Sequence, residues 1–143
     1  MKQITRREEY GLKGLLFLAQ QPDEKVFLVS EISRVQEIPE SFLAKIFQQL
    51  LKAGFLRSVR GSKGGFSLRK TAAEITMKEV IEALEGPIAI NRCLLRKGEC
   101  GEEQGCPLYE VLEEAQEGLL KVLERTTIED LAKRIPNGKR GRR

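Results

Sequence analysis

Length, composition and charge set the first limits on this chain. Its 143 residues suffice for one compact domain and an appended segment, and a hydrophobic content of 41% allows a buried core. No apolar run approaches the roughly 18 residues that a transmembrane helix needs. The apolar N-terminal stretch is interrupted by Gly11, Lys13 and Gly14 and has no signal-peptide cleavage site, so we expect a cytoplasmic protein that does not bind membranes.

The net charge of +4 is distributed unevenly along the chain. Residues 57–70 carry five basic side chains and no acidic one, residues 98–120 carry seven Glu and no basic residue, and the tail is basic again. A basic segment in the first half indicates a polyanionic partner, although a solvated surface can have the same composition.

Two helices are predicted in the first 37 residues. Thr5, with Glu8 three residues later, is a capping-box pattern, and it starts a helix that runs to about Gln20. The apolar, β-branched run at 26–29 is expected to form a short strand. Ser30 is then expected to cap the second helix.

The third helix has the clearest pattern. It is predicted to begin at Pro39 and to end at Ala53, with Gly54 as its C-terminal cap. Its apolar residues recur with the spacing of a core-facing stripe, and its polar residues on the other side can read base edges or hold phosphates. The apolar stripe is Leu43, Ile46, Phe47 and Leu50, and the outward residues are Ser41, Lys45, Gln48 and Lys52.

A β-hairpin is predicted next, with strands at 55–59 and 66–68 around a Gly-rich tip. Arg60 and Lys63 lie between the glycines of this tip, where the backbone can approach DNA closely and an Arg can enter a minor groove. Helix, helix, turn, helix and hairpin is the order of a winged helix-turn-helix. Each part alone is more often an ordinary surface helix or turn, but together they favour DNA binding.

Three elements follow in the second half. Thr76 is expected to cap a helix that ends at 84 or 85, and a cysteine-containing loop comes next. Pro107 is expected to start a long helix with one apolar side. Thr127, with Asp130 three residues later, is expected to start a last short helix.

The three cysteines of the chain, Cys93, Cys100 and Cys106, all lie in this loop. An odd number cannot pair completely within one chain, and clustered thiols of a cytosolic protein are typical of ligands or sensors. We therefore expect a metal or iron–sulfur site, whose fourth ligand is not a histidine because the chain has none. A zinc site and a metal-free thiol switch stay open.

Other classes of function are weighed against this interpretation. An enzyme is not expected, since the chain has no His, no nucleotide-binding loop and no nucleophile–base pair. An iron–sulfur protein that does not bind DNA and a protein-binding scaffold with the acidic stretch 98–117 as its surface stay open.

Four segments, in this order, resemble one known family. RGSKGGFSL, from Arg60, is similar to the family's RGxxGGYxL wing, and IPESFLAKIFQQLLKAGFL is similar to its recognition helix. EVIEALEGP and the three-cysteine loop follow in the same order. On these motifs, about residues 1–135 resemble the Rrf2 family of winged-helix regulators, which includes IscR and NsrR.

The resemblance implies a mainly α fold with a small β-hairpin wing and a long C-terminal dimerisation helix. It divides the chain into four parts. These are a winged helix-turn-helix domain at 1–75, a connecting helix and cluster loop at 76–107, dimerisation helices at 108–135, and a basic tail at 136–143 that is expected to be disordered.

The resemblance also implies the partners. The family's regulators bind palindromic double-stranded DNA as homodimers, and we expect a repressor. By position, the family's DNA contacts fall on Ser41, Lys45, Arg60 and Gly61, and the helix face and hairpin tip add Gln48 and Lys63. Lys45 stands where IscR-like members have Gln, so a different operator is expected.

The implied cofactor is an iron–sulfur cluster on the three cysteines, with 2Fe-2S favoured over 4Fe-4S, that senses iron–sulfur status, redox state or nitric oxide. IscR-like members add a histidine, whereas NsrR-like members add a carboxylate from the first helix of the partner subunit. Alignment on Tyr10 places Glu9 at that position. Alternative ligands are Glu99, Glu102 and Glu103 of the loop, and an alternative function is a cluster-free or zinc-bound thiol-sensing regulator.

Overall fold

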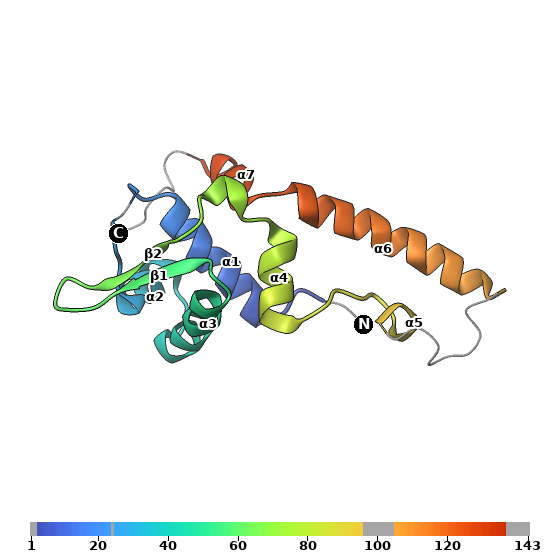
Figure 1. The fold of residues 1–143 in the computed structure, drawn as a ribbon, viewed down its shortest axis with the longest axis horizontal. Coiled ribbons are helices and arrows are strands. Elements are labelled where there is room, and N and C mark those ends of the chain that lie inside the picture. The colour runs from blue at the N-terminus through green and yellow to red at the C-terminus, as the bar shows by residue number, and fades with distance from the viewer. Residues whose placement is uncertain (1–2, 24, 96–104, 137–143) are drawn as a thin grey trace.

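The computed structural model describes residues 3–23, 25–95 and 105–136 and shows a helical body from which one long helix projects (Figure 1). The predicted class, mainly helical with one two-stranded hairpin, is confirmed. None of the helices in these ranges could cross a membrane. In chain order the elements are α1 (Arg6–Ala19), α2 (Val29–Gln36), α3 (Glu40–Lys52), β1 (Leu56–Val59), β2 (Gly65–Leu68), the 3₁₀ turn η1 (Ala72–Glu74), α4 (Met77–Glu85), α5 (Arg92–Leu95), α6 (Pro107–Arg125) and α7 (Ile128–Lys133).

Capping boxes start three of these helices, as the sequence predicts. In each, the Thr hydroxyl accepts a hydrogen bond from the backbone N–H three residues later, and the acidic side chain at that position accepts from the N–H of the Thr. Each cap contributes about 1 kcal/mol and requires only neighbouring residues. The pairs are Thr5 with Glu8, Thr76 with Glu79, and Thr127 with Asp130.

The segment between α1 and α2 differs from the prediction. Among the described residues of this segment, only Phe27 pairs with β2, in an isolated bridge in which Phe27 and Phe66 exchange hydrogen bonds of 2.9 and 2.7 Å. The predicted strand at 26–29 is therefore wrong, because the helical backbone already begins at Val29. The predicted cap at Ser30 is wrong for the same reason, since this residue lies inside the first turn of α2.

The core is built around α1, whose glycines let two neighbouring helices come close. A Cβ at Gly14 would lie 2.5 Å from the ring of Phe47 on α3, and a Cβ at Gly11 would lie 2.5 Å from Leu84 on α4. The predicted stripe of α3 is confirmed, since all four of its residues are fully buried. This packing fixes α3 relative to the rest of the body and leaves its opposite face outward.

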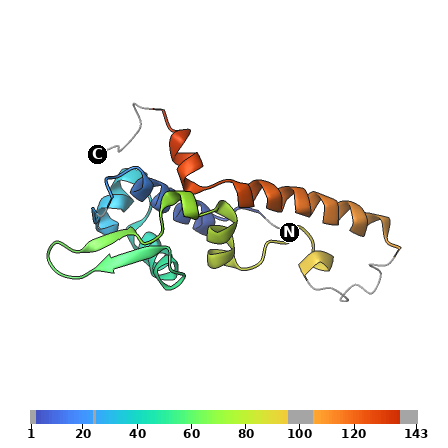
Figure 2. The same cartoon turned by 45° about the horizontal axis from the view of Figure 1, so that its top comes forward.

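A short β-like contact joins α4 to the junction of α6 and α7. Met77 N–H donates to the carbonyl of Thr126, and Ile128 N–H donates to the carbonyl of Ile75, both at 2.9 Å. Leu123, near the end of α6, packs with Ile81 and Ile88 in a second apolar cluster. One end of α6 is thus fastened to the body, and Figure 2 shows the remainder extending away from it.

The cap of α7 leads to a titration prediction. Hydrogen bonds from the backbone N–H and the hydroxyl of Thr127 hold the pKa of Asp130 below its ordinary value. Because the folded pKa is the lower one, the contact stabilises the fold above the ordinary pKa, and this contribution is lost as pH falls through the folded value. Carbon-detected NMR is expected to give a midpoint below that of an unfolded Asp. In Thr127→Ala the midpoint is expected to rise, and an unchanged midpoint would exclude a role for the hydroxyl.

Candidate functional site

The face of α3 that points away from the core carries polar side chains that are exposed to solvent. Ser41, Lys45 and Gln48 are all exposed, as predicted, while Leu43, Ile46 and Phe47 are buried. The turn before this helix is set by Glu37, which adopts the left-handed conformation with φ of 56° and ends α2. Phe42 lies edge-on against Tyr10 of α1, with ring centroids 5.7 Å apart. At Ser41, Lys45 and Gln48 the helix therefore presents a hydroxyl, a cation and an amide to solvent, and contacts with the core hold it in place.

The hairpin tip is shaped by glycines. Gly61 has a φ of 108°, and its carbonyl accepts a 3.0 Å hydrogen bond from the N–H of Gly64. A Cβ at Gly64 would lie 2.2 Å from the carbonyl oxygen of Val59, so only glycine fits this tight turn. Arg60, Gly61 and Lys63 are exposed at the tip, as the sequence predicts.

The hairpin and α3 lie on the same side of the molecule, away from α7 (Figures 1 and 2). Phe66 of β2 stacks edge-on against Phe47 of α3 at a centroid distance of 5.3 Å, which ties the two elements together. Two exposed cationic surfaces, one on a helix and one on a hairpin tip, thus share a rigid base. This arrangement suits a helix in a major groove with a wing beside it.

The cysteines are only partly within the described residues. Cys93 lies in α5 and Cys106 is the N-cap of α6, and both are half-buried free thiols. Cys100 lies outside the described residues, as do the alternative ligands Glu99, Glu102 and Glu103. Within the described ranges, no three His, Cys, Asp or Glu side chains gather closely enough to hold a metal ion.

Polar groups lie beside both of the described thiols. The Nδ2 of Asn91 lies 3.5 Å from the Sγ of Cys93 and can donate to it. Cys106 stands at the N-terminus of α6, where backbone N–H groups point toward an anion. The helix α5, which carries Cys93, packs against α6, which begins after Cys106.

Glu8 and Glu9 are adjacent on α1, and of the two only the side chain of Glu9 is accessible to solvent. Glu8 is fully buried, and its carboxylate accepts a 3.0 Å hydrogen bond from the N–H of Thr5. Glu9 instead forms an ion pair of 3.0 Å with Lys13, and both side chains are 45% exposed. The hydrogen bond and charge of Lys13 hold the pKa of Glu9 below its ordinary value. Among the described residues of the single chain, Glu9, Cys93 and Cys106 do not form a group that could hold a metal ion.

The long helix α6 carries exposed apolar side chains. Leu108 and Val111 are 69% and 63% exposed, and Val122 and Leu95 of α5 are also exposed. Sequence reasoning missed the contact that joins this helix to the loop. The Oε1 of Gln116 accepts a 3.0 Å hydrogen bond from the N–H of Ile90, and no local pattern could reveal a contact across 26 residues.

Comparison with known proteins identifies the family. Residues 4–134 match the model of Rrf2, described as an iron-dependent transcriptional regulator. CymR, the global cysteine regulator of B. subtilis, is 29% identical with a TM-score of 0.74, and the match covers 95% of this chain and 100% of that one. The oxidised form of Staphylococcus aureus CymR is 27% identical with a TM-score of 0.74 and coverages of 95% and 100%.

A third similar structure is the IscR of T. potens. It is 25% identical with a TM-score of 0.74, and the match covers 92% of this chain and 87% of that one. The resemblance that the wing, recognition-helix and loop motifs indicate is thereby confirmed, and so is the winged-helix fold. The chain belongs to the Rrf2 family of DNA-binding transcriptional regulators.

Proposed function

We propose that this chain is a homodimeric repressor of transcription whose affinity for palindromic DNA is controlled by an iron–sulfur cluster on Cys93, Cys100 and Cys106. The main support is the position of two of these thiols. Cys93 and Cys106 stand at the two ends of the segment that joins the DNA-binding half to α6. A group bound there would act on the connection between the two halves.

The DNA contacts follow from the exposed groups. Ser41, Lys45 and Gln48 of α3 would face base edges and phosphates of the major groove. Arg60, Gly61 and Lys63 would bring the wing to the adjacent backbone or minor groove. The 57–70 segment carries no acidic side chain, so no charge in it opposes the approach of phosphate.

The dimer follows from α6. Leu108, Val111 and Val122 are exposed apolar side chains, and burial against a second copy would remove them from water at about 25 cal/mol per Å². A two-fold dimer would place one winged helix on each half-site of a palindrome. The division into a DNA-binding domain, a connecting segment, dimerisation helices and a tail, with boundaries after residues 75, 107 and 135, stays a prediction.

The cysteine loop fits an iron–sulfur cluster chemically. Three thiolates are typical soft ligands, and Glu9 of the partner subunit is proposed as a harder and weaker fourth ligand. When bound, such a cluster supplies one-electron chemistry and a crosslink that is lost when its iron is removed. The chain's own contribution is to hold the thiols, through Asn91 beside Cys93 and the N-terminus of α6 beside Cys106.

Switching is proposed to act through the segment between α4 and α6. Its first part is held to α6 by the hydrogen bond from Ile90 to Gln116. Ordering or releasing the loop would bias the position of α6 and hence the separation of the two recognition helices, as other order–disorder switches do.

The experiment is anaerobic purification with iron and sulfide analysis, visible and EPR spectra, and gel-shift titration of the protein before and after chelation. We expect iron and acid-labile sulfide in equal amounts and at least about a tenfold change in DNA affinity, the usual size of allosteric coupling. Protein without iron or sulfide, or equal affinity in the two states, would contradict the proposal.

Glu9 is tested separately. In Glu9→Ala the cluster spectrum is expected to change and the cluster to be lost faster to a chelator, because the site would lack its fourth protein ligand. Glu82→Ala is the matched control, since Glu82 forms an equivalent helical ion pair with Lys78 at 3.7 Å and is not a proposed ligand. Equal spectra and loss rates for both variants would exclude Glu9 as a ligand.

A cluster-free thiol sensor is the second candidate. It is favoured by the half-buried free thiols of Cys93 and Cys106 and by the similarity to a CymR solved in an oxidised form. In this case, peroxide would change the DNA affinity of iron-free protein, dithiothreitol would restore it, and Cys93→Ser would abolish the response. A response that is seen only with iron present would favour the cluster instead.

A further inference from the structure

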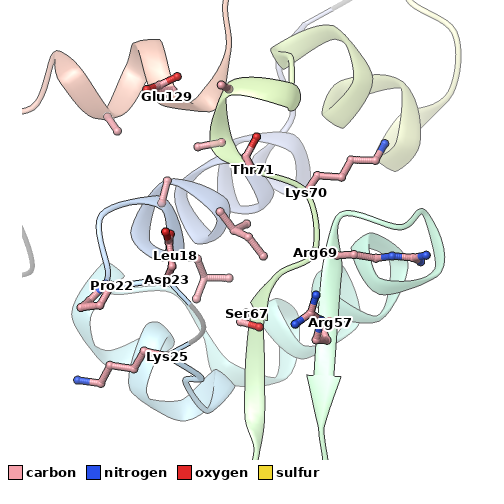
Figure 3. Close-up of a pocket in the computed structure, with 15 residues that line it drawn as sticks. Leu18, Pro22, Asp23, Lys25, Arg57, Ser67, Arg69, Lys70, Thr71 and Glu129 are labelled. Carbon is pink, nitrogen blue, oxygen red and sulfur yellow. The ribbon is translucent and has the colours of Figure 1, made fainter.

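A hollow of about 490 Å³ lies at the root of the wing, between the end of α1, the two strands, η1 and α7 (Figure 3). Its volume is within the range of small-molecule sites. The space exists because most of the side chains that α1, η1 and α7 contribute are small. The apolar part of the lining consists of Leu18, Ala19, Leu68, Ala72, Ala73 and Ala132.

Two hydrogen-bond donors on the hairpin face this hollow. Arg57 and Ser67 are direct partners in the antiparallel register, and the nitrogen atoms of Arg57 lie beside Ser67 in Figure 3. The Ser67 residue is only 5% exposed. In the described part of the chain, Arg57 has no salt bridge and the Ser67 hydroxyl has no hydrogen bond. A guanidinium and a hydroxyl side by side are suitable donors for one carboxylate.

The other cations of the lining are turned elsewhere. Lys25 and Lys70 point away from the hollow, and their Nζ atoms lie 5.1 Å from the ring centroids of Phe27 and Phe55, respectively. Arg69 also points outward. Arg57 is therefore the cation that a ligand in this hollow would meet.

The opposite wall is acidic. Asp23, after the end of α1, lines the hollow across from Arg57 and has no ion-pair partner among the residues that the structure describes. Glu129, on α7, lies 3.5 Å from Lys133 and is already paired. A ligand that is only anionic would meet the unpaired Asp23 carboxylate, whereas an ammonium group would pair with it.

We propose that this hollow binds a small zwitterion, a free α-amino acid with an apolar side chain. Its carboxylate would bind Arg57 and Ser67, its ammonium group would bind Asp23, and its side chain would lie on the alanine-lined floor. The bound molecule would connect the wing to α7 and the end of α1. The effect on DNA binding rests on the proposed repressor function, but binding of the amino acid does not.

Calorimetry on the full chain tests the site with three probes. L-leucine carries both charged groups, 4-methylpentanoate lacks the ammonium group, and 3-methylbutylamine lacks the carboxylate. We expect L-leucine to bind with a Kd of about 1 mM or lower and each analogue to bind at least about tenfold more weakly. No heat from L-leucine at about ten times that concentration would overturn the proposal. Equal binding of 4-methylpentanoate would also overturn it, since Asp23 would then have no role.

Substitutions at residues that line the hollow test whether L-leucine binds there. In Arg57→Gln, L-leucine is expected to bind at least about tenfold more weakly, while Arg34→Gln, an exposed Arg of α2 outside the hollow, is expected to leave it unchanged. Arg57 is exposed, so the variant should keep its fold, and Asp23→Asn provides a second test on the opposite wall. Unchanged binding in both hollow variants would overturn the site.

Gel shifts with and without L-leucine test the connection to the wing separately. A change in DNA affinity with L-leucine that is absent in Arg57→Gln supports it. If calorimetry shows binding of L-leucine but the DNA affinity does not change, the amino-acid site stands and its proposed effect on the wing is overturned. Weaker DNA binding by Arg57→Gln without any amino acid, together with unchanged binding of L-leucine, would assign Arg57 to a DNA phosphate and overturn its role in the hollow.

Discussion

Replacing Phe47 with alanine is expected to lower the free energy of unfolding by about 3–5 kcal/mol, the usual cost of removing a fully buried aromatic ring. Phe47 is completely buried and contacts both Gly14 of α1 and Phe66 of the wing. The loss of the ring would leave a cavity where three elements meet, because the structure around a deleted core side chain relaxes only in part. Urea unfolding followed by circular dichroism measures the change.

Phe42→Ala is the matched control on the same helix. Phe42 is exposed and contacts mainly the edge of Tyr10, so its replacement is expected to cost only about 1 kcal/mol. Equal losses in Phe42→Ala and Phe47→Ala would mean that the junction of α1, α3 and the wing does not stabilise the fold as described.

Arg60→Ala is expected to weaken binding to the operator by a factor of about 5 to 150, which corresponds to about 1–3 kcal/mol for a specific Arg contact to DNA. If Arg60 instead binds only phosphate, the loss is expected to be the same on random DNA, and the slope of log K against log salt falls by about 1. Fluorescence anisotropy at several salt concentrations measures both quantities.

Lys133→Ala serves as the control for Arg60. Lys133 is exposed and is the last residue of α7, a helix on the side of the molecule away from α3 (Figure 1). Its Nζ lies 3.5 Å from the Oε1 of Glu129. Its replacement is expected to leave both affinity and salt slope unchanged. An Arg60→Ala protein that behaves like this control would show that the wing tip does not touch DNA.

The parts of the fold that depend on neighbouring residues could be predicted from the sequence. The starts after Thr5, Thr76 and Thr127 were predictable because a hydroxyl and a carboxylate three residues apart satisfy each other. The short strand at 26–29 was not, because it depends on how much of the segment can pair with β2, about 40 residues later. Only Phe27 makes that pairing before α2 begins.

The candidate sites also contain features that local sequence predicts and features that depend on contacts between distant residues. The outward positions of Ser41, Lys45 and Gln48 follow from the period of a helix with a buried stripe, and the exposed tip follows from its glycines. The contact of Ile90 with Gln116 and the hollow between α1, the hairpin, η1 and α7 arise only when distant segments pack. The DNA contacts and the ligand set of Cys93, Cys100, Cys106 and Glu9 stay predictions.

The fastening of α6 by the bonds at Met77 and Ile128 also makes this helix a lever. Its 19 residues span about 28 Å at 1.5 Å per residue. A rotation of only about 10° around the fastened end would therefore move Cys106, at the far end, by about 5 Å. A sub-ångström change in the pairing of Thr76 with Thr127 is thus amplified at Cys106, and a displacement of Cys106 acts on that pairing through the same helix.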